Sequence, residues 1–449
     1  MYVYRNDDLP PDPTFPVDLK SLGYFLNAQD QIRQIDNPEE GFKYKVNRND
    51  RFNIKHREAI NGKMSSWILI WYEQANAAPE CIRPMVLERL KDAGLQILPL
   101  PLCSPPNDTT VPILVSKNIS KKSRIIVVCG EPNQDLGIWA YRSIHEGINY
   151  GSAVNLTKAV LGEKMENDVG LIIANTGQLI WHCASERAVT QQTWLASPRP
   201  YGNWGQPTMS WRNKIPHNND WSQHVQYVFK KVLWPYVNGK KTRIDVIGMS
   251  EGGLAALKYL QVDWHVWQPY ISGICLGDPQ QTTYSDLDMG TIGDPLSFTS
   301  FIASRCRAYV VSDDPLGTTQ AGYRLYGCNC YSSGEKLNSE CIIPVAWKDM
   351  LQWLDTLYKD PEHSEHVMLC ADDMDDQMRR EIEEQAKDHE EDTEAKDLEW
   401  KQELETAAKL KDDAPDNQIK QDENAKSDEE PADISQKMEN LKVVDTNVA

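Results

Sequence analysis

The sequence predicts an α/β fold with a doubly wound, mostly parallel sheet and helices on both faces. Two observations carry this prediction: short apolar runs alternate with helical stretches, and a glycine-flanked serine stands between one run and the following helix. The length of 449 residues and the hydrophobic share of 40% allow one large domain with extensions.

Six apolar, mostly β-branched runs are expected to form strands, and most of them end near Gly, Asp or Asn. They are Val111–Val115, Arg124–Val128, Val169–Ala174, Ile244–Ile247, Ile271–Leu276 and Ala308–Val311. Helical stretches between several of them are Ser152–Leu161, Gln223–Tyr236, Gly253–Gln261 and Asp294–Arg305. Because parallel strands are joined by crossovers that are usually helical, this alternation favours a mostly parallel sheet.

The pattern G-x-S-x-G occurs at residues 248–252, with Ser250 at its centre. A buried strand before it and a helix after it make this the nucleophile elbow of an α/β-hydrolase. Gly248, Gly252 and Gly253 are the elbow glycines, because a strained turn leaves no room for a Cβ beside the serine. Ser250 is therefore the candidate nucleophile, and an ordinary glycine-rich turn is the alternative.

An oxyanion hole would use backbone N–H groups at two places. The candidates are Glu251, which follows the nucleophile, and Gly130, which ends an earlier strand together with Cys129. The carboxylate of Glu251 disfavours an oxyanion nearby unless it points away.

Three aspartates that follow strands are candidates for the catalytic acid: Asp278, Asp313 and Asp314. The alternative role for each is to cap a helix or turn. The chain order Ser, Asp, His leaves His363 and His366 as candidate bases, with exposed surface histidines as the alternative. The loop expected at Gly327–Pro344 has no histidine. An inactive or altered hydrolase fold is therefore favoured over a working triad.

Composition divides the chain into a short N-terminus, a domain and a tail. Residues 1–16 are expected to be disordered, 17–368 to form the domain, and 369–449 to form an acidic tail that is partly helical or disordered. The domain contains an N-terminal extension at 17–105, with helices expected at His56–Ala75 and Ile82–Leu95, and a tryptophan-rich insertion at 178–222. The insertion is read as a packed cap, with a ligand groove and base stacking as alternatives.

Charge and motifs exclude several classes of protein. Residues 371–449 carry a net charge of −16, which leaves −3 for the rest of the chain. A nearly neutral domain makes direct nucleic-acid binding weak or absent, and no apolar run is long enough to span a membrane. Ten scattered cysteines without a C-x-x-C pair predict reduced thiols and no metal site, and no cofactor is expected.

Several blocks in the same order resemble the Arb-two domain family. The blocks are Phe15-Pro16, Leu22–Asn27 with Gln31–Arg33, Gly130 with Gly137–Ala140, His224–Phe229, Gly248–Gly253, Gly277-Asp278, Ser312–Gly317 and Gly327-Cys328 with Ser332–Gly334. The resemblance covers roughly residues 15–358. It departs at Glu335–Glu340, where the family often has a His-Glu pair and this chain has Asn338 near the place of the base.

The resemblance implies an α/β-hydrolase-like fold that serves mainly as a protein-interaction module. The implied partners are Argonaute or other silencing-complex proteins, with association with a histone deacetylase as a further option. The implied setting is nuclear RNA silencing and heterochromatin assembly, with a cytoplasmic population left open. The second hypothesis is a serine esterase or lipase-like hydrolase that uses Ser250.

Overall fold

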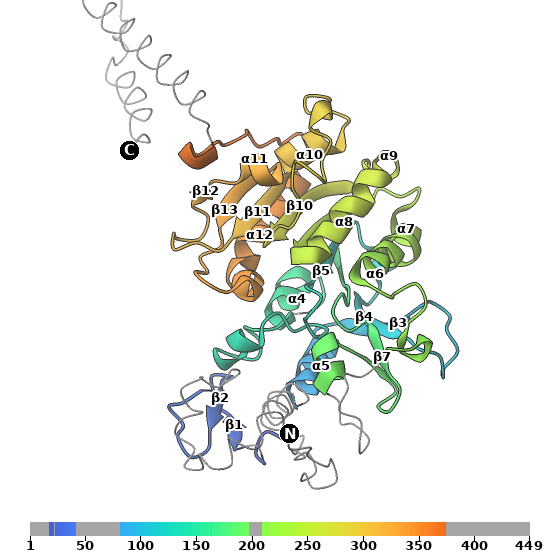
Figure 1. Cartoon of the computed structure of the whole chain (residues 1–449), viewed down its shortest axis with the longest axis vertical. Coiled ribbons are helices and arrows are strands. Elements are labelled where there is room, and N and C mark those ends of the chain that lie inside the picture. The colour runs from blue at the N-terminus through green and yellow to red at the C-terminus, as the bar shows by residue number, and fades with distance from the viewer. Residues whose placement is uncertain (1–17, 22, 42–80, 163, 197–208, 374–449) are drawn as a thin grey trace, which may run out of the picture. The chain divides into compact units, whose positions relative to one another are not determined.

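The computed structural model describes residues 18–21, 23–41, 81–162, 164–196 and 209–373 (Figure 1). The expected helix at His56–Ala75 and most of the acidic tail lie outside these residues. Met1–Asp375 forms one compact unit, and it contains every described residue.

A nine-stranded mixed sheet in the order β12-β13-β11-β10-β9-β5-β6-β4-β3 forms the centre of this unit (Figure 1). Six adjacent strands are parallel. β12 and β4 run antiparallel to them on either side, and the edge strand β3 pairs antiparallel with β4. The strands are β3 (Leu95–Leu100), β4 (Val111–Ser116), β5 (Arg124–Cys129), β6 (Val169–Ile173), β9 (Arg243–Met249), β10 (Ile271–Gly277), β11 (Cys306–Val310), β12 (Thr319–Gln320) and β13 (Asn329–Ser332).

Each face of the sheet has its own hydrophobic core. In β5, Ile125 and Val127 belong to one core and Ile126 and Val128 to the other, as alternation along a strand requires. The first core takes in α6 (Trp221–Tyr227), α8 (Ser250–Val262) and α10 (Phe298–Arg305). The second takes in α4 (Val154–Leu161), α12 (Ile342–Lys359) and a helix over residues 81–92. The prediction of a doubly wound α/β sheet of the α/β-hydrolase type is confirmed.

The six expected strands all form, but three strands of this sheet, β3, β12 and β13, were not predicted. β3 starts at Leu95, where the sequence suggested the end of a helix, and only its end residues Leu95 and Leu100 are buried. β13 occupies part of the stretch expected to be a loop, because Asn329–Ser332 is short and carries polar residues that are nevertheless buried. The predicted helix Gln223–Tyr236 is continuous but is π-helical over Val228–Leu233.

Two short antiparallel hairpins lie outside the large sheet. They pair β1 (Tyr24–Leu26) with β2 (Ile32–Gln34) and β7 (Ile180–His182) with β8 (Arg187–Val189). The second hairpin belongs to the tryptophan-rich insertion. There Trp194 is buried and Trp181 and Trp221 pack against the core, as expected of a packed cap, whereas Trp211 is 78% exposed.

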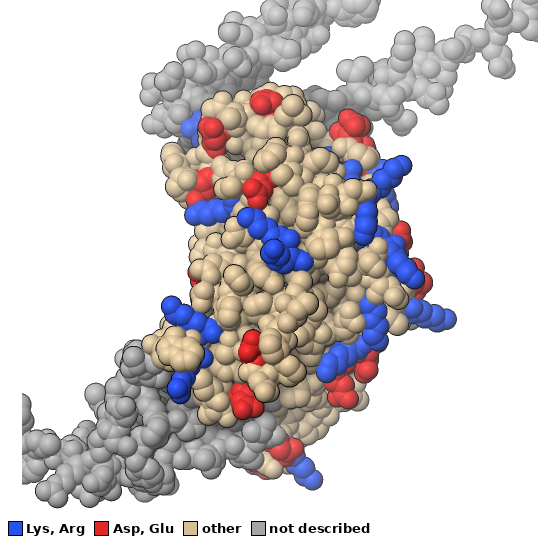
Figure 2. Space-filling model, turned by 90° about the vertical axis from the view of Figure 1, so that its right-hand side faces the viewer, with Lys and Arg blue, Asp and Glu red and all other residues tan. Residues whose placement is uncertain are grey.

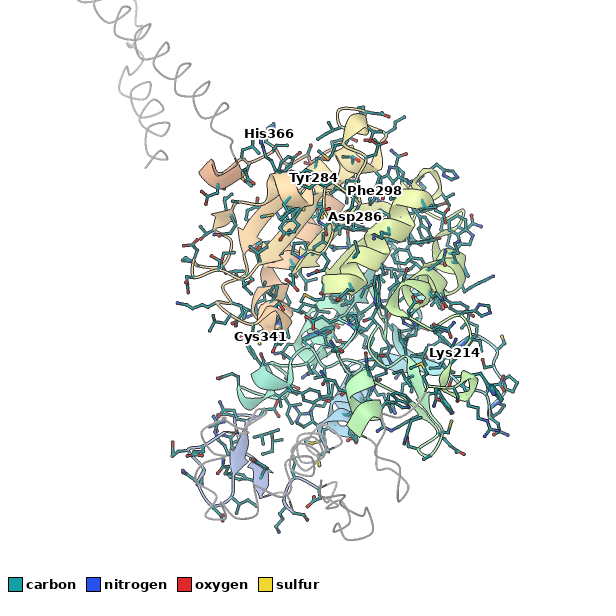
Figure 3. The ribbon with its side chains drawn as sticks, in the orientation of Figure 1. Lys214, Tyr284, Asp286, Phe298, Cys341 and His366 are labelled. Carbon is teal, nitrogen blue, oxygen red and sulfur yellow. The ribbon has the colours of Figure 1, made fainter. Side chains whose placement is uncertain are left out.

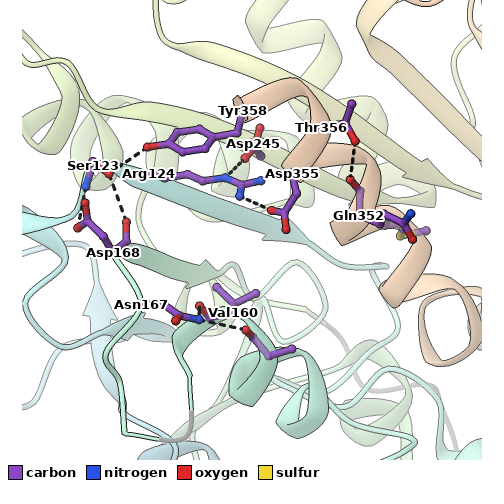
Figure 4. Close-up of polar contacts among 12 residues, drawn as sticks. Ser123, Arg124, Val160, Asn167, Asp168, Asp245, Gln352, Asp355, Thr356 and Tyr358 are labelled. Atoms are coloured by element: carbon purple, nitrogen blue, oxygen red, sulfur yellow. Dashed lines mark hydrogen bonds and ion pairs between the residues drawn. The ribbon is translucent and has the colours of Figure 1, made fainter. Parts of the chain in front are cut away.

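A buried ionic network ties α12 to the amino ends of β5 and β9 (Figure 4). The guanidinium of Arg124 contacts Asp245 at 2.5 Å and also pairs with Asp355. The ring of Tyr358 lies against Arg124, with 4.7 Å from the guanidinium carbon to the ring centroid. Arg124 and Asp245 are almost fully inaccessible to solvent, so each requires the charge of the other.

His224 connects α6 to the loop after β6. Its Nε2 accepts the backbone N–H of Asn175 at 3.0 Å, and its Nδ1 lies 2.7 Å from the side-chain oxygen of Asn218. Complete burial lowers the pKa of His224 to about 3, so the imidazole stays neutral in the folded protein. His224 therefore acts as a neutral bridge between two segments.

His224 should make the domain less stable as the pH falls below about 6.5. The unfolded chain takes up a proton there while the folded chain does so only near pH 3, so unfolding becomes easier by up to about 1.4 kcal/mol per pH unit. Urea titrations between pH 7.5 and 4.5 should show that the free energy of unfolding falls more steeply with decreasing pH for wild type than for His224→Gln, whose side chain cannot titrate. Equal slopes would mean that His224 is not held neutral.

The surface of the domain fits the nearly neutral charge of its sequence. On the face shown in Figure 2, basic and acidic side chains are interspersed among uncharged residues. Within the described part of the chain, no helix is long and apolar enough to cross a membrane.

Candidate functional site

Ser250 lies at a sharp turn between β9 and α8, as the G-x-S-x-G pattern predicts. It is the first residue of α8 and has a φ of 48°, a strained value for a residue with a Cβ. A Cβ on Gly252 would lie 2.1 Å from the carbonyl oxygen of Gly130, and one on Gly248 would lie 2.4 Å from the Cα of Gly253. These glycines let β9, α8 and the loop after β5 meet at the elbow.

Two carboxylates engage the hydroxyl of Ser250. It donates a hydrogen bond of 2.7 Å to Glu251, the next residue. The carboxyl of Asp278, which follows β10, also interacts with the hydroxyls of Ser250 and Ser339. Asp278 has a φ of 49°, so it too lies in a strained turn at a strand end. The structure thus brings Ser250 together with Asp278 among the candidate acids.

Glu131 and Glu340 bring two further carboxyl groups to this site. Burial raises the pKa of the Glu131 carboxyl to about 7. The charges of Glu340, Asp278 and Glu251 add to this rise, in that order. Burial and the charge of Glu251 likewise raise the pKa of Asp278. A site crowded with carboxylates opposes the formation of an oxyanion.

In the loop after β5, the N–H group next to the candidate oxyanion donor Gly130 is bonded within the loop. The N–H of Glu131 donates to the side-chain oxygen of Gln134 at 3.1 Å. The carbonyl of Gly130 accepts the hydroxyl of Thr176 at 2.6 Å and faces Gly252. The loop therefore presents a carbonyl oxygen to the elbow, and Glu251 turns its carboxylate onto Ser250 instead of away from it.

The candidate base His363 lies near the amino ends of the parallel strands, whereas Ser250 follows the carboxyl end of β9. Its backbone carbonyl accepts Arg305, whose Nε donates to the carbonyl of Ser272 near the start of β10. Gly277, at the far end of β10, pairs with the residue before Ser250. Five residues of extended strand separate these ends by about 16 Å. His363 instead packs its ring against Trp353.

His366 also lies near the amino ends of the parallel strands. Its carbonyl accepts the side chain of Asn329, the first residue of β13. Figure 3 shows His366 at the opposite end of this part of the molecule from Cys341, which directly follows Glu340. The hypothesis of a base from His363 or His366 is therefore wrong, because the segment after α12 returns to the ends at which the parallel strands begin.

Asp313 and Asp314 follow β11 but have other partners. Asp313 is exposed and lies 3.6 Å from Lys336, and Asp314 accepts the side chain of Gln320 at 2.7 Å. Among the described side chains neither is hydrogen-bonded to Ser250, so both behave as the turn residues of the alternative interpretation. The loop after β13 does reach the site, through Ser339. Asn338 turns back to Glu335, and Ser339 takes the position beside Asp278.

Among the described side chains, no histidine hydrogen-bonds to Ser250, Asp278 or Ser339. No group of three or more His, Cys, Asp or Glu in the described residues has the geometry of a metal site. Sequence reasoning missed Glu131, Glu340 and Ser339. Only the position of Ser339, next to Asn338 in the loop after the last parallel strand, could have indicated one of them.

The model of the Arb2 domain matches residues 15–316, which is most of the chain. The chain belongs to the Arb2 domain family. This confirms the resemblance seen in the sequence blocks and agrees with the hydrolase-like sheet and elbow. No curated protein matches the chain.

Solved structures that resemble this Arb2-domain chain include a histone deacetylase and hydrolases. The histone deacetylase, from Saccharomyces cerevisiae, has 13% identity and a TM-score of 0.36, covering 62% of this chain and 96% of its own. The esterase Est22 has 18% identity and a TM-score of 0.30, with 68% and 89% covered. The peroxisomal α/β-hydrolase Lpx1 from Saccharomyces cerevisiae has 9% identity and a TM-score of 0.30, with 67% and 97% covered. At these scores, the fold assignment rests on the strand order and the elbow.

Proposed function

We propose that this Arb2-domain protein is a scaffold or interaction protein built on a degenerate hydrolase fold. Its partners are Argonaute or other silencing-complex proteins, with a histone deacetylase as a further associate. It acts in RNA silencing and heterochromatin assembly in the nucleus, and a cytoplasmic population is compatible with this role. Membership of the Arb2 domain family supports the setting.

The surroundings of Ser250 carry the non-catalytic part of this proposal. A serine nucleophile needs a base that removes its proton and donors that stabilise an oxyanion. In the described residues the hydroxyl of Ser250 meets carboxylates from Glu251 and Asp278, and the loop after β5 presents the carbonyl oxygen of Gly130 to the elbow. Loss of the base alone lowers turnover by several orders of magnitude.

A serine esterase or lipase-like hydrolase is the second candidate. The strained φ of Ser250 favours it, since a strained strand-to-helix turn also holds the nucleophile of a working enzyme.

Affinity purification of the tagged full chain, followed by mass spectrometry, tests the proposed function. Argonaute or histone deacetylase subunits should co-purify with wild type and equally with Ser250→Ala, because binding does not need the hydroxyl. Recovery of neither kind of protein would refute the silencing role. Recovery that depends on Ser250 would point to the site as a working centre.

A further inference from the structure

A groove of about 540 Å³ begins at Asp278 and extends to Asp372 and Asp373. Its walls come from the end of β11, from the loop after β10 and from α11 (Tyr323–Tyr326). Hydrogen bonds from Thr283 to the carbonyls of Arg324 and Leu325 hold this loop against α11. The groove is therefore bounded by segments that are themselves fixed.

Large apolar side chains are exposed inside this groove. Tyr284 is 88% exposed, and Val311 and Leu325 are each 41% exposed (Figure 3 labels Tyr284). A single exposed apolar residue is ordinary, but three that line one groove are typical of an interaction site. Tyrosine is also among the residues that contribute most to binding energy at interfaces.

The charge of the groove is negative at the end nearest Ser250. Asp278 lines the groove there, and the carboxylates of Glu251 and Glu131 are its electrostatic neighbours. At the other end Asp373 accepts the backbone N–H groups of Gly322 and Cys370, which use its charge locally. Arg324 is the basic residue of the lining. Three carboxyl groups, those of Asp278, Glu251 and Glu131, thus lie near one another at this end of the groove.

We propose that this groove binds an extended peptide segment of a partner protein, in which an aliphatic side chain lies within a few residues of a lysine or arginine. The aliphatic side chain packs against Tyr284, Leu325 and Val311. The cationic group lies at Asp278, where the carboxylates compensate its charge. The inference rests on the proposed function, since it assigns a partner-binding surface to the protein.

Selection from a random dodecapeptide display library on the full chain tests this groove. Enriched peptides should combine aliphatic residues with a nearby Lys or Arg. Fluorescence anisotropy with an enriched, fluorescein-labelled peptide should then show binding weakened roughly tenfold or more in Tyr284→Ala. Asp278→Asn should weaken binding several-fold and reduce its dependence on salt. Asparagine tolerates the positive φ of this position, so its fold is kept.

Trp211→Ala is the matched control, because Trp211 is an aromatic residue that is 78% exposed and lies outside the groove. It should leave peptide binding unchanged. Enrichment of acidic peptides, no enrichment, or equal binding by wild type and Tyr284→Ala would overturn the proposal. So would a wild-type dimer that Tyr284→Ala dissociates in sedimentation, since the groove would then bind a second copy of this chain.

Failure of this inference is distinguishable from failure of the proposed function. If silencing or deacetylase components co-purify equally with wild type and Tyr284→Ala, the groove is refuted and the function stands. The opposite outcome is that wild type recovers neither component in the purification and still enriches basic, aliphatic peptides whose binding is lost in Tyr284→Ala. In that case the proposed function is refuted and the peptide-binding groove stands.

Discussion

Replacing Gly252 with alanine should destabilise the domain by more than about 4 kcal/mol, enough to leave most of the protein molecules unfolded. The added Cβ would lie 2.1 Å from the carbonyl oxygen of Gly130 and 2.9 Å from that of Cys129. Both are backbone atoms, and Thr176 holds the first of them in place. Alanine normally stabilises a helix relative to glycine by about 1 kcal/mol, so the steric clash decides the sign.

Urea denaturation followed by circular dichroism measures this effect. Gly290→Ala is the matched control, because the added Cβ would lie 3.3 Å from one side-chain oxygen of Asp288 and Gly290 is exposed. The control should unfold close to wild type. A folded Gly252→Ala protein with a similar midpoint would show that the elbow is not as tightly packed as described.

Replacing Arg124 with methionine should cost about 3–5 kcal/mol of unfolding free energy. Methionine keeps much of the side-chain volume but leaves the buried carboxyl of Asp245 without its partner. Burial already raises the pKa of Asp245 to about 6 against the opposing charge of Arg124. Without the guanidinium this pKa should rise further, so the variant should lose most stability above pH 6.

The double variant with Asp245→Asn distinguishes this cause from lost packing. Removal of the unpaired charge should recover part of the stability at pH 7.5 in denaturant titrations. Lys336→Met, at the exposed pair with Asp313, should leave the midpoint unchanged. If Arg124→Met unfolds like wild type, the network at the amino edge does not stabilise the domain.

The sequence predicted the central strands because they are apolar runs buried on both faces. Val127 and Ile244, for example, are fully buried, and each lies in a parallel strand that has neighbours on both sides. β13 was not predicted because it contains no apolar run. Its polar residues Asn329 and Ser332 are buried, and their side chains are hydrogen-bonded to backbone carbonyls. Burial of polar residues depends on partners distant in sequence, which a local pattern cannot show.

The candidate site was predicted in part. The elbow pattern indicated Ser250 and its glycines, and the strand-end rule indicated Asp278, because both follow from local chain geometry. The prediction of His363 or His366 as the base failed for a different reason. The order of residues in the chain does not determine whether a segment returns to the amino or the carboxyl ends of the strands. Arg305 and Asn329, which hold the backbone carbonyls of His363 and His366, keep this segment at the amino ends.

Labelling with a fluorophosphonate probe tests most directly whether Ser250 is a working nucleophile. Wild type and Ser250→Ala should be compared at equal concentration, with an active serine esterase as a positive control. We predict that wild type shows no labelling above Ser250→Ala, because Glu251 and Asp278 surround the hydroxyl instead of a histidine. Labelling of wild type that is lost in Ser250→Ala would contradict the account and establish a serine hydrolase.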